Sequence, residues 1–159
     1  MPLSHTGPDG APHMVDVGDK PETQREATAE AFVVCAPSTL VEIAANRGPK
    51  GDALAVARLA ALQAPKRTPE LVPLCHPLRI SSVEVDLELV QPDRVRVWAR
   101  VRAVERTGVE MEALTAVLVG ALTLYDMVKA IDRGATITEA RVLTKQGGKT
   151  GTWVRQPAP

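Results

Sequence analysis

Apolar and charged side chains alternate most regularly in two neighbouring segments in the middle of the chain. Residues 82–90 read "SVEVDLELV", with acidic side chains between apolar ones, and residues 94–105 read "RVRVWARVRAVE", with arginines between valines and alanines. A period of two is typical of a strand with one buried face. The "QPD" between the segments has the composition of a turn, so this pattern predicts an antiparallel hairpin.

The same pattern predicts the register of the hairpin. Apolar side chains meet on one face and acidic side chains meet arginines on the other only if the offset between the strands is even. Because exposed ion pairs each contribute little, we interpret these charges as stabilising the sheet and not as a binding surface. The expected partners are Val90 with Arg94, Glu88 with Arg96, and Glu84 with Arg100.

Two helices are expected before the hairpin, after a short strand at residues 31–36, "AFVVCA". The first helix, in "PSTLVEIAANRG", has Ser38 or Thr39 as its cap, with Thr39 and Glu42 at capping-box spacing. The second helix, in "GDALAVARLAALQA", ends before Pro65. The core stripe of the second helix consists of Leu54, Ala57, Ala61 and Leu62.

The longest helical pattern follows the hairpin, from "TGVEMEAL" to "MVKAID", and closes near Gly134. Thr107 and Glu110 again have capping-box spacing. A last strand is expected in "TITEARVLT", residues 136–144. The apolar stripe of the long helix, which we assign to the core, consists of Met111, Leu114, Leu118 and Leu122.

The order of these elements is strand, two helices, two strands, helix and strand. It predicts an α+β fold, the ferredoxin-like sandwich, with an antiparallel sheet covered by helices on one face. Residues 1–30 are rich in proline, glycine and charge, which predicts a loose N-terminal arm. We divide the chain into a flexible arm at 1–12, a single domain at 13–151 and a tail at 152–159.

The composition of the 159 residues is that of a globular protein, with 45% hydrophobic and 24% charged residues. The 19 basic residues balance the 19 acidic ones and only 3% are aromatic, so neither nucleic acid nor an anionic membrane is an expected partner. We find no apolar run near the length of a membrane span and no secretory signal. Cys35 and Cys75 can in principle form one disulfide, but a soluble, cytoplasmic protein is the expectation.

Basic side chains gather in three loops. The glycine-rich "GGKTG" is not the phosphate loop of nucleotide hydrolases, because that motif needs a glycine where Leu143 stands. Lys145 and Lys149 can still close over an anion, and a solvated tail is an equal alternative. Lys50, in "RGPKGDAL", lies where helix amides favour an anion, although an exposed turn lysine is the simpler interpretation. Lys66, in "PKRTPE", adds a further basic group.

Asp126 and Lys129 lie three residues apart in an otherwise apolar part of the long helix. They can form an ordinary intrahelical ion pair, or a half-buried pair whose pKa values move enough for proton transfer. Glu112 precedes Asp126 by fourteen residues, which is about 21 Å of helix. A site that uses both ends of this helix therefore needs a long ligand, such as a nucleoside triphosphate, or residues from a second subunit.

Cys75 and His76 are neighbours in "ELVPLCHPLRI", between Pro73 and Pro77. A zinc site needs three or four ligands, and the other two histidines belong to the arm, so the sequence disfavours a metal here. A cysteine nucleophile with a histidine base is disfavoured as well, because sequence neighbours usually point apart. Prolines fix the backbone angles, so we expect a rigid ledge that holds a ligand.

Several of these segments together resemble one known family. The segments "KGDALAVARLAALQAPKRT", "LVPLCHPL", "TGVEMEALTA", "LTLYDMVKA" and "LTKQGGKTG" are similar in order and spacing to those of the cyclic pyranopterin monophosphate synthases, the MoaC family of molybdenum cofactor biosynthesis. The resemblance extends from "HMVDV" at residue 13 to residue 151. One departure is Thr150, where many relatives carry serine.

The resemblance implies a lyase with a ferredoxin-like fold that converts 3′,8-cyclo-7,8-dihydro-GTP to cyclic pyranopterin monophosphate and releases pyrophosphate. It also implies a homohexamer, a trimer of dimers, with active sites at dimer interfaces. No cofactor and no metal site are implied, and Mg²⁺ accompanying the triphosphate is not required by the sequence. The alternative is a non-catalytic nucleotide-binding regulatory module on the same fold.

Each residue role is carried over from a matching motif. The catalytic candidates are Asp126, Lys129 and Lys50, which can serve as acids and bases in ring opening, pyran closure and cyclic phosphate formation. Lysines can also stabilise the departing pyrophosphate. The substrate-binding candidates, to which Glu110 and Lys66 are added as nearby charged groups, are Leu74, Cys75, His76, Glu110, Met111, Glu112, Lys66, Lys145 and Lys149.

Overall fold

The computed structural model describes residues 5–157, and its central hairpin is the one that the alternating pattern predicts. Strands β2 (Ile80–Val90) and β3 (Arg94–Glu105) are antiparallel neighbours. The pairing is Val90 with Arg94, Glu88 with Arg96, and Glu84 with Arg100, as expected. The last two pairs are ion pairs on the outer face of the sheet, with N to O distances of 3.7 and 3.6 Å. Complementary charge and apolar alternation therefore suffice to fix this register.

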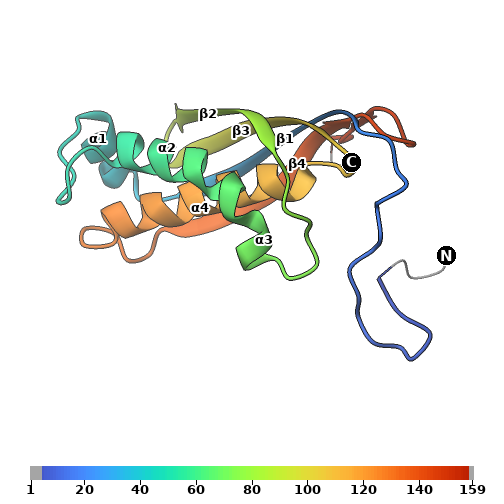
Figure 1. Ribbon diagram of the computed structural model, residues 1–159. Coiled ribbons are helices and arrows are strands. Elements are labelled where there is room, and N and C mark those ends of the chain that lie inside the picture. Colours follow the sequence, from blue (N-terminus) through green and yellow to red (C-terminus); the bar gives the residue numbers. More distant parts are fainter. Residues whose placement is uncertain (1–4, 158–159) are drawn as a thin grey trace.

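Strand β1 (Thr23–Val34) lies in the centre of the sheet, between β3 and β4 (Thr136–Gln146). Within residues 5–157 the strand order is β2-β3-β1-β4-β5, with every neighbour antiparallel and β5 only the two residues Trp153–Val154. The first four strands follow the order of the ferredoxin-like sandwich, with the helices on one face (Figure 1). The predicted fold class is confirmed, and β5 is an addition that no pattern in the sequence indicated.

Strand β1 begins at Thr23 and not at residue 31. Its inward side chains are mostly alanine, and Ala27, Ala29 and Ala31 are fully buried. Alanine alternating with glutamate and threonine has the composition of an arm, which explains why the prediction of a loose segment is wrong for residues 23–30. Residues 5–22 contain no helix or named strand, and residues 1–4 and 158–159 of the expected arm and tail lie outside the described residues.

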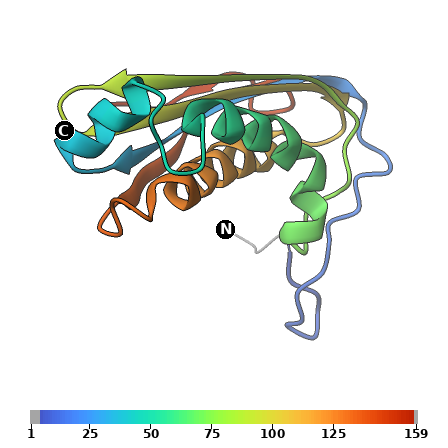
Figure 2. The same ribbon diagram turned by 90° about the vertical axis from the view of Figure 1, so that its left-hand side faces the viewer.

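The helices form the second layer of the fold. Figure 2 shows α2 and α4 side by side beneath the sheet, with α1 at one end and α3 at the other. Helix α2 packs on α4, and α4 in turn packs on β1, β3 and β4. The bounds are α1 (Pro37–Ala44), α2 (Ala53–Gln63), the 3-10 turn η1 (Ala64–Arg67), α3 (Thr68–Leu71) and α4 (Glu110–Val128).

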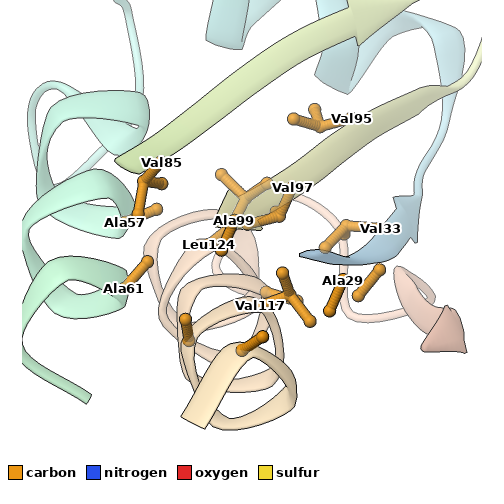
Figure 3. Packing of buried hydrophobic residues seen from close by; sticks show 14 of the residues in the cluster. Ala29, Val33, Ala57, Ala61, Val85, Val95, Val97, Ala99, Val117 and Leu124 are labelled. Carbon is orange, nitrogen blue, oxygen red and sulfur yellow. The ribbon is translucent and has the colours of Figure 1, made fainter. Parts of the chain in front are cut away.

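Small side chains let α2, α4 and the sheet approach closely, as Figure 3 shows around the labelled alanines and valines. Ala57 and Ala61 of α2 are fully buried, and the two leucines of the predicted stripe are partly buried beside them. A Cβ atom on Gly120 of α4 would lie only 3.1 Å from Ala61 Cβ and 3.1 Å from Val97 Cγ1. The α2 stripe predicted from the sequence is therefore confirmed.

Neither capping box expected from the sequence forms at the start of α1 or of α4, both of which lie wholly within the described residues. The start of α1 is capped from a distant part of the chain. Asp132 Oδ2 accepts hydrogen bonds from the Ala36 amide at 2.7 Å and from Thr39 Oγ1 at 3.1 Å. Asp132 Oδ1 accepts one more from the Gly134 amide at 3.1 Å. Local spacing could not indicate a cap that is so remote in sequence.

Three of the four residues in the α4 stripe that we assigned to the core are exposed instead, and only Leu114 is partly buried against the core. Met111, Leu118 and Leu122 keep 39%, 42% and 57% of their surface accessible. Both faces of α4 are apolar, so the periodicity alone could not identify the face that meets the sheet. The close approach of the layers selects the face with the smaller side chains. The buried residues of α4 include Ala113, Ala116, Val117, Gly120, Ala121, Leu124 and Val128.

Helix α4 is also the one helix in residues 5–157 that is long and apolar enough to cross a membrane by length and composition. We expected no segment with the length and apolar composition of a membrane span, and this expectation is wrong for α4, which has 19 residues and a mean hydropathy of 1.5. In the fold 56% of that window is buried inside the protein. The apolar composition of α4 therefore follows from its place in the core of a soluble domain and from the exposed stripe.

Candidate active site

Lys50, Asp126 and Lys129 meet at the C-terminal end of α4, and we call them the lysine cluster. Lys50 Nζ donates to Asp126 Oδ2 at 2.6 Å, and Lys129 Nζ lies 2.7 Å from Asp126 Oδ1. Each carboxylate oxygen therefore holds one ammonium group. The three side chains are between 44% and 50% exposed, so the cluster is open to a ligand. The structure thus brings together the three residues that the sequence made catalytic candidates.

The two ammonium groups keep the carboxylate of this cluster charged. The hydrogen bond from Lys129, followed by the one from Lys50, lowers the pKa of Asp126 to about 2. The same hydrogen bond raises the pKa of Lys129 above its usual value. At neutral pH Asp126 is therefore ionised and Lys129 is protonated, an arrangement that can bind an anion and donate a proton.

Lys50 reaches Asp126 from the loop between α1 and α2. Gly51 next to it has φ of +94°, in the left-handed region that favours glycine. The following residue, Asp52, caps α2, because its Oδ1 accepts a hydrogen bond from the Ala55 amide at 2.9 Å. The loop thus turns sharply after Lys50 and ends at a fixed helix start, which holds the lysine near the end of α4.

Leu74, Cys75, His76, Met111 and Glu112 lie together elsewhere, and we call them the ledge cluster. They line one cleft of about 290 Å³ between the segment after α3 and the start of α4. All five were candidates for substrate binding, so the structure groups them as the sequence led us to expect. The cleft has both apolar walls and titratable groups, which is typical of small-molecule sites.

Glu112 is the buried carboxyl of the ledge cluster, with only 3% of its surface exposed. Burial raises its pKa to about 7, and the charge of Glu110 adds to the rise. Burial also raises the pKa of Cys75, with a further contribution from Glu112. Near neutral pH Glu112 can therefore exchange a proton, whereas the thiol of Cys75 stays protonated and is a poor nucleophile.

Lys145 belongs to the same end of α4, because its Nζ lies 3.4 Å from Glu110 Oε1. Lys149 is exposed in the turn after β4, where two successive glycines have positive φ. Lys66 lies on η1 and lines a separate cleft with residues of α2 and β2. The structure thus pairs Lys145 with Glu110 at the start of α4, next in sequence to the ledge-cluster residue Met111, and places Lys66 outside both clusters.

The segment before β1 lies against the ledge cluster, a contact that was not expected from the sequence. Val15, Val17 and Lys20 line the same cleft, and the His76 ring donates through Nε2 to the Val15 carbonyl oxygen at 2.8 Å. Arg106 holds the segment further along, with its Nη1 donating to the Gly18 carbonyl oxygen at 2.6 Å. The short apolar run "MVDV" was the only signal of this contact in the sequence.

The two clusters lie at opposite ends of α4 and do not meet within one chain. Glu112 and Asp126 are fourteen residues apart on this unbroken helix, or about 21 Å. No group of three His, Cys, Asp or Glu side chains in residues 5–157 is placed to hold a metal ion. Cys35 and Cys75 are both free, so the disulfide considered from the sequence does not form.

Comparison with known proteins shows one family model whose match to the chain includes the residues of both clusters. The model of the MoaC family matches residues 14–148, which is most of the chain. The chain belongs to the MoaC family. The match begins in the segment that contacts His76 and ends in the glycine-rich turn after Lys145. Membership of the MoaC family confirms the resemblance seen in the sequence motifs.

Two curated MoaC relatives carry the same name. A protein of Thermomicrobium roseum is 53% identical over 155 residues, covering 97% of this chain and 93% of the relative. A protein of Streptomyces coelicolor is 55% identical over 154 residues, covering 96% of this chain and 89% of the relative. Each is named cyclic pyranopterin monophosphate synthase.

Proposed function

We propose that this member of the MoaC family is a cyclic pyranopterin monophosphate synthase, a lyase of molybdenum cofactor biosynthesis. It converts 3′,8-cyclo-7,8-dihydro-GTP to cyclic pyranopterin monophosphate and releases pyrophosphate. The lysine cluster is the observation that carries this proposal, because a carboxylate between two ammonium groups suits proton transfer next to a departing polyphosphate. The names of both relatives support the same activity.

The lysine cluster can supply acids to this reaction. Ring opening, pyran closure and cyclic phosphate formation each require protons to move between oxygen, nitrogen or carbon atoms. Lys129 enters the reaction protonated, because its pKa is raised by Asp126. The ionised Asp126 orients both lysines, and either ammonium group can stabilise negative charge on the leaving pyrophosphate.

The ledge cluster can hold the rest of the substrate. Glu112, with a pKa of about 7, is able to take up or release a proton in the working pH range. Lys145, which pairs with Glu110 at the start of α4, offers a positive charge to the triphosphate, with Lys149 in the glycine-rich turn as a second phosphate contact. Met111 contributes apolar surface for the heterocycle.

We also propose that one complete site forms between two copies of the chain. Met111, Leu118, Leu122 and Lys129 follow one another at spacings of seven, four and seven residues, which at about 100° per residue keeps all four on one line along α4. The two outer positions belong to the two clusters. The two inner positions are the exposed leucines, so apolar surface joins the half-sites.

An antiparallel pairing of two α4 helices, centred midway between Leu118 and Leu122 on the exposed face, makes these surfaces complementary. It places Leu118 against Leu122 of the partner subunit, and Met111 against Lys129 of the partner subunit. A twofold interface of this kind is closed and buries the apolar stripe of both copies. Each interface then contains two identical sites, each made from the lysine cluster of one copy and the ledge cluster of the other.

Further expectations follow from the family resemblance and remain part of this proposal. The dimers assemble into a homohexamer, a trimer of dimers, in the cytoplasm. The reaction is a rearrangement with loss of pyrophosphate, so it needs no redox cofactor. Mg²⁺ can accompany the triphosphate as a counterion of the substrate.

The direct test is incubation of the purified protein with 3′,8-cyclo-7,8-dihydro-GTP, followed by detection of cyclic pyranopterin monophosphate and pyrophosphate. Lys50→Ala and Lys129→Ala should each abolish turnover while the fold is kept. Absence of product from the folded wild-type protein at every pH between about 6 and 9 would refute the proposed activity. That result together with nucleotide binding would favour the regulatory module.

Mixing variants of different clusters tests the shared site. Lys129→Ala and His76→Ala lie in different clusters, so a mixed dimer contains one intact site. Random mixing should give about one quarter of the wild-type activity, plus about one quarter of whatever activity His76→Ala retains alone. The matched control is a mixture of Lys50→Ala and Lys129→Ala. Both changes affect the same cluster, so no mixed dimer has an intact site. Recovery in this control, or its absence in the first mixture, contradicts the shared site.

A further inference from the structure

The N-terminal segment makes a defined hydrogen bond with the imidazole of His76 in the ledge cluster. His76 Nε2 lies 2.8 Å from the Val15 carbonyl oxygen. A carbonyl oxygen only accepts hydrogen bonds, so Nε2 must carry the proton of this bond. In the neutral ring the other nitrogen, Nδ1, is then an acceptor with no proton. Within residues 5–157 no hydrogen bond to Nδ1 of His76 is formed.

The carbonyl of Val15 is held in place by the side chain of Val15 and by contacts of the residues that follow it. Val15 and Val17 are half-buried in the cleft wall. Three residues after Val15, the Gly18 carbonyl oxygen accepts a hydrogen bond from Arg106 at 2.6 Å. Figures 1 and 2 both show this segment running past the loop after α3. We call residues 14–20 the strap.

The protonation pattern of His76 decides what kind of group it can bind. A doubly protonated or Nδ1–H imidazole would offer a donor, which suits a phosphate oxygen. A neutral ring with Nε2–H already bonded offers only an acceptor, which suits a hydroxyl or N–H group. The cleft contains several other titratable groups that can meet a ligand, namely His5, Lys20, Cys75 and Glu112.

We propose that the strap is a positioning element that fixes the tautomer of His76, with Nε2–H on the Val15 carbonyl and Nδ1 toward the ligand. His76 then recognises an N–H or O–H donor of the nucleoside part of the substrate, and the lysines recognise the phosphates. The second half of this inference rests on the proposed function. The first half concerns the free protein and is independent of it.

The tautomer can be measured without any substrate. Nitrogen-15 NMR of the full chain, labelled at histidine and carrying His5→Gln and His13→Gln, reports the two ring nitrogens of His76 alone. We expect a protonated Nε2 and an unprotonated Nδ1 in the neutral ring. The Nδ1–H form, or a mixture of both forms, overturns the inference even if the enzyme activity is confirmed.

The role of the strap is tested by loosening it in the full chain. Val15→Gly combined with Val17→Gly removes both apolar anchors, and we expect the single tautomer to become a mixture. Met14→Gly is the matched control, because Met14 belongs to the same segment but is 48% exposed and does not line the cleft. A single Nε2–H tautomer in the double variant would show that the strap does not set it.

Two amide substitutions separate the two ring nitrogens in the activity assay. In His76→Gln the side-chain N–H can take the place of Nε2–H and keep the hydrogen bond to the Val15 carbonyl oxygen. This variant has no hydrogen-bond acceptor at the position of Nδ1. In His76→Asn the side-chain oxygen lies near the position of Nδ1, but the hydrogen bond to the Val15 carbonyl oxygen of the strap is lost. Loss of one neutral hydrogen bond predicts a KM roughly 2- to 12-fold higher for His76→Gln than for His76→Asn. Equal KM values, or the reverse order, contradict recognition through Nδ1.

Discussion

Replacing Leu118 and Leu122 by glutamine tests whether α4 forms the interface between subunits. Both side chains are exposed in the single chain, so the double variant should leave the stability of the isolated subunit within about 0.5 kcal/mol. Glutamine and leucine also have similar helix propensities. The assembly should respond strongly, because two leucines per subunit lose their apolar contact with the partner.

The size of this effect follows from the exposed fractions. Leu118 and Leu122 expose 42% and 57% of their surface, which together is about the area of one whole leucine side chain per subunit. Full burial of a leucine contributes about 1.5–3 kcal/mol. The twofold interface contains two such contributions, so the double variant should weaken association by about 3–6 kcal/mol, or roughly two to four powers of ten in Kd.

Sedimentation over a dilution series measures this Kd, and circular dichroism confirms that the subunit stays folded. Leu59→Gln is the matched control, because Leu59 is 58% exposed on the neighbouring helix α2 and lies off the proposed interface. Activity per chain should fall in parallel with dissociation. If the double variant assembles as tightly as Leu59→Gln and the wild type, the antiparallel pairing of α4 is refuted.

Three further substitutions test other parts of the structure. Asp132→Ala removes the remote cap of α1 and should cost about 2 kcal/mol in urea unfolding at pH 7. Because the pKa of Asp132 is lowered in the fold, its contribution is lost as the pH falls through the folded value, so the variant and the wild type should converge in acid. Glu112 has a raised pKa of about 7, so wild-type stability should fall by up to about 3 kcal/mol as the pH rises from about 4.5 through 7, and unfolding of Glu112→Gln should show a flatter pH profile. The valine side chain of Gly120→Val would overlap Ala61 and Val97, so this variant should have a free energy of unfolding about 1–3 kcal/mol lower than the wild type. An unchanged free energy of unfolding would contradict the close packing of α2, α4 and β3.

The hairpin of β2 and β3 could be predicted in full from the sequence, because each position carries two signals, its polarity and the sign of its charge. Strand β1 carries neither signal strongly. Its buried positions are alanines, and the composition of residues 23–30 is that of a solvated segment. The strand is fixed by its neighbours on both sides, and such long-range pairing leaves no local pattern.

The site was predictable to a similar degree. Asp126 and Lys129 are three residues apart, so their ion pair could be expected from helix geometry. Lys50 joins them from a loop 76 residues away, and only the family resemblance connected these residues beforehand. The contact between His76 and the strap depends on a backbone carbonyl, which has no sequence signature of its own.

In the proposed shared site, the alanine-lined packing of α4 also fixes the position of the lysine cluster relative to the ledge cluster. Alanine loses no rotamer freedom on burial, and its short side chain leaves α4 little room to slide or roll on the sheet. Helix α4 therefore holds Met111 and Lys129 at a fixed distance along the helix axis and at a fixed angle about it. Inserting a single residue near its middle would lengthen it by only about 1.5 Å but turn one end by about 100° relative to the other. Such an insertion should disable both half-sites at once, although neither would have lost a residue.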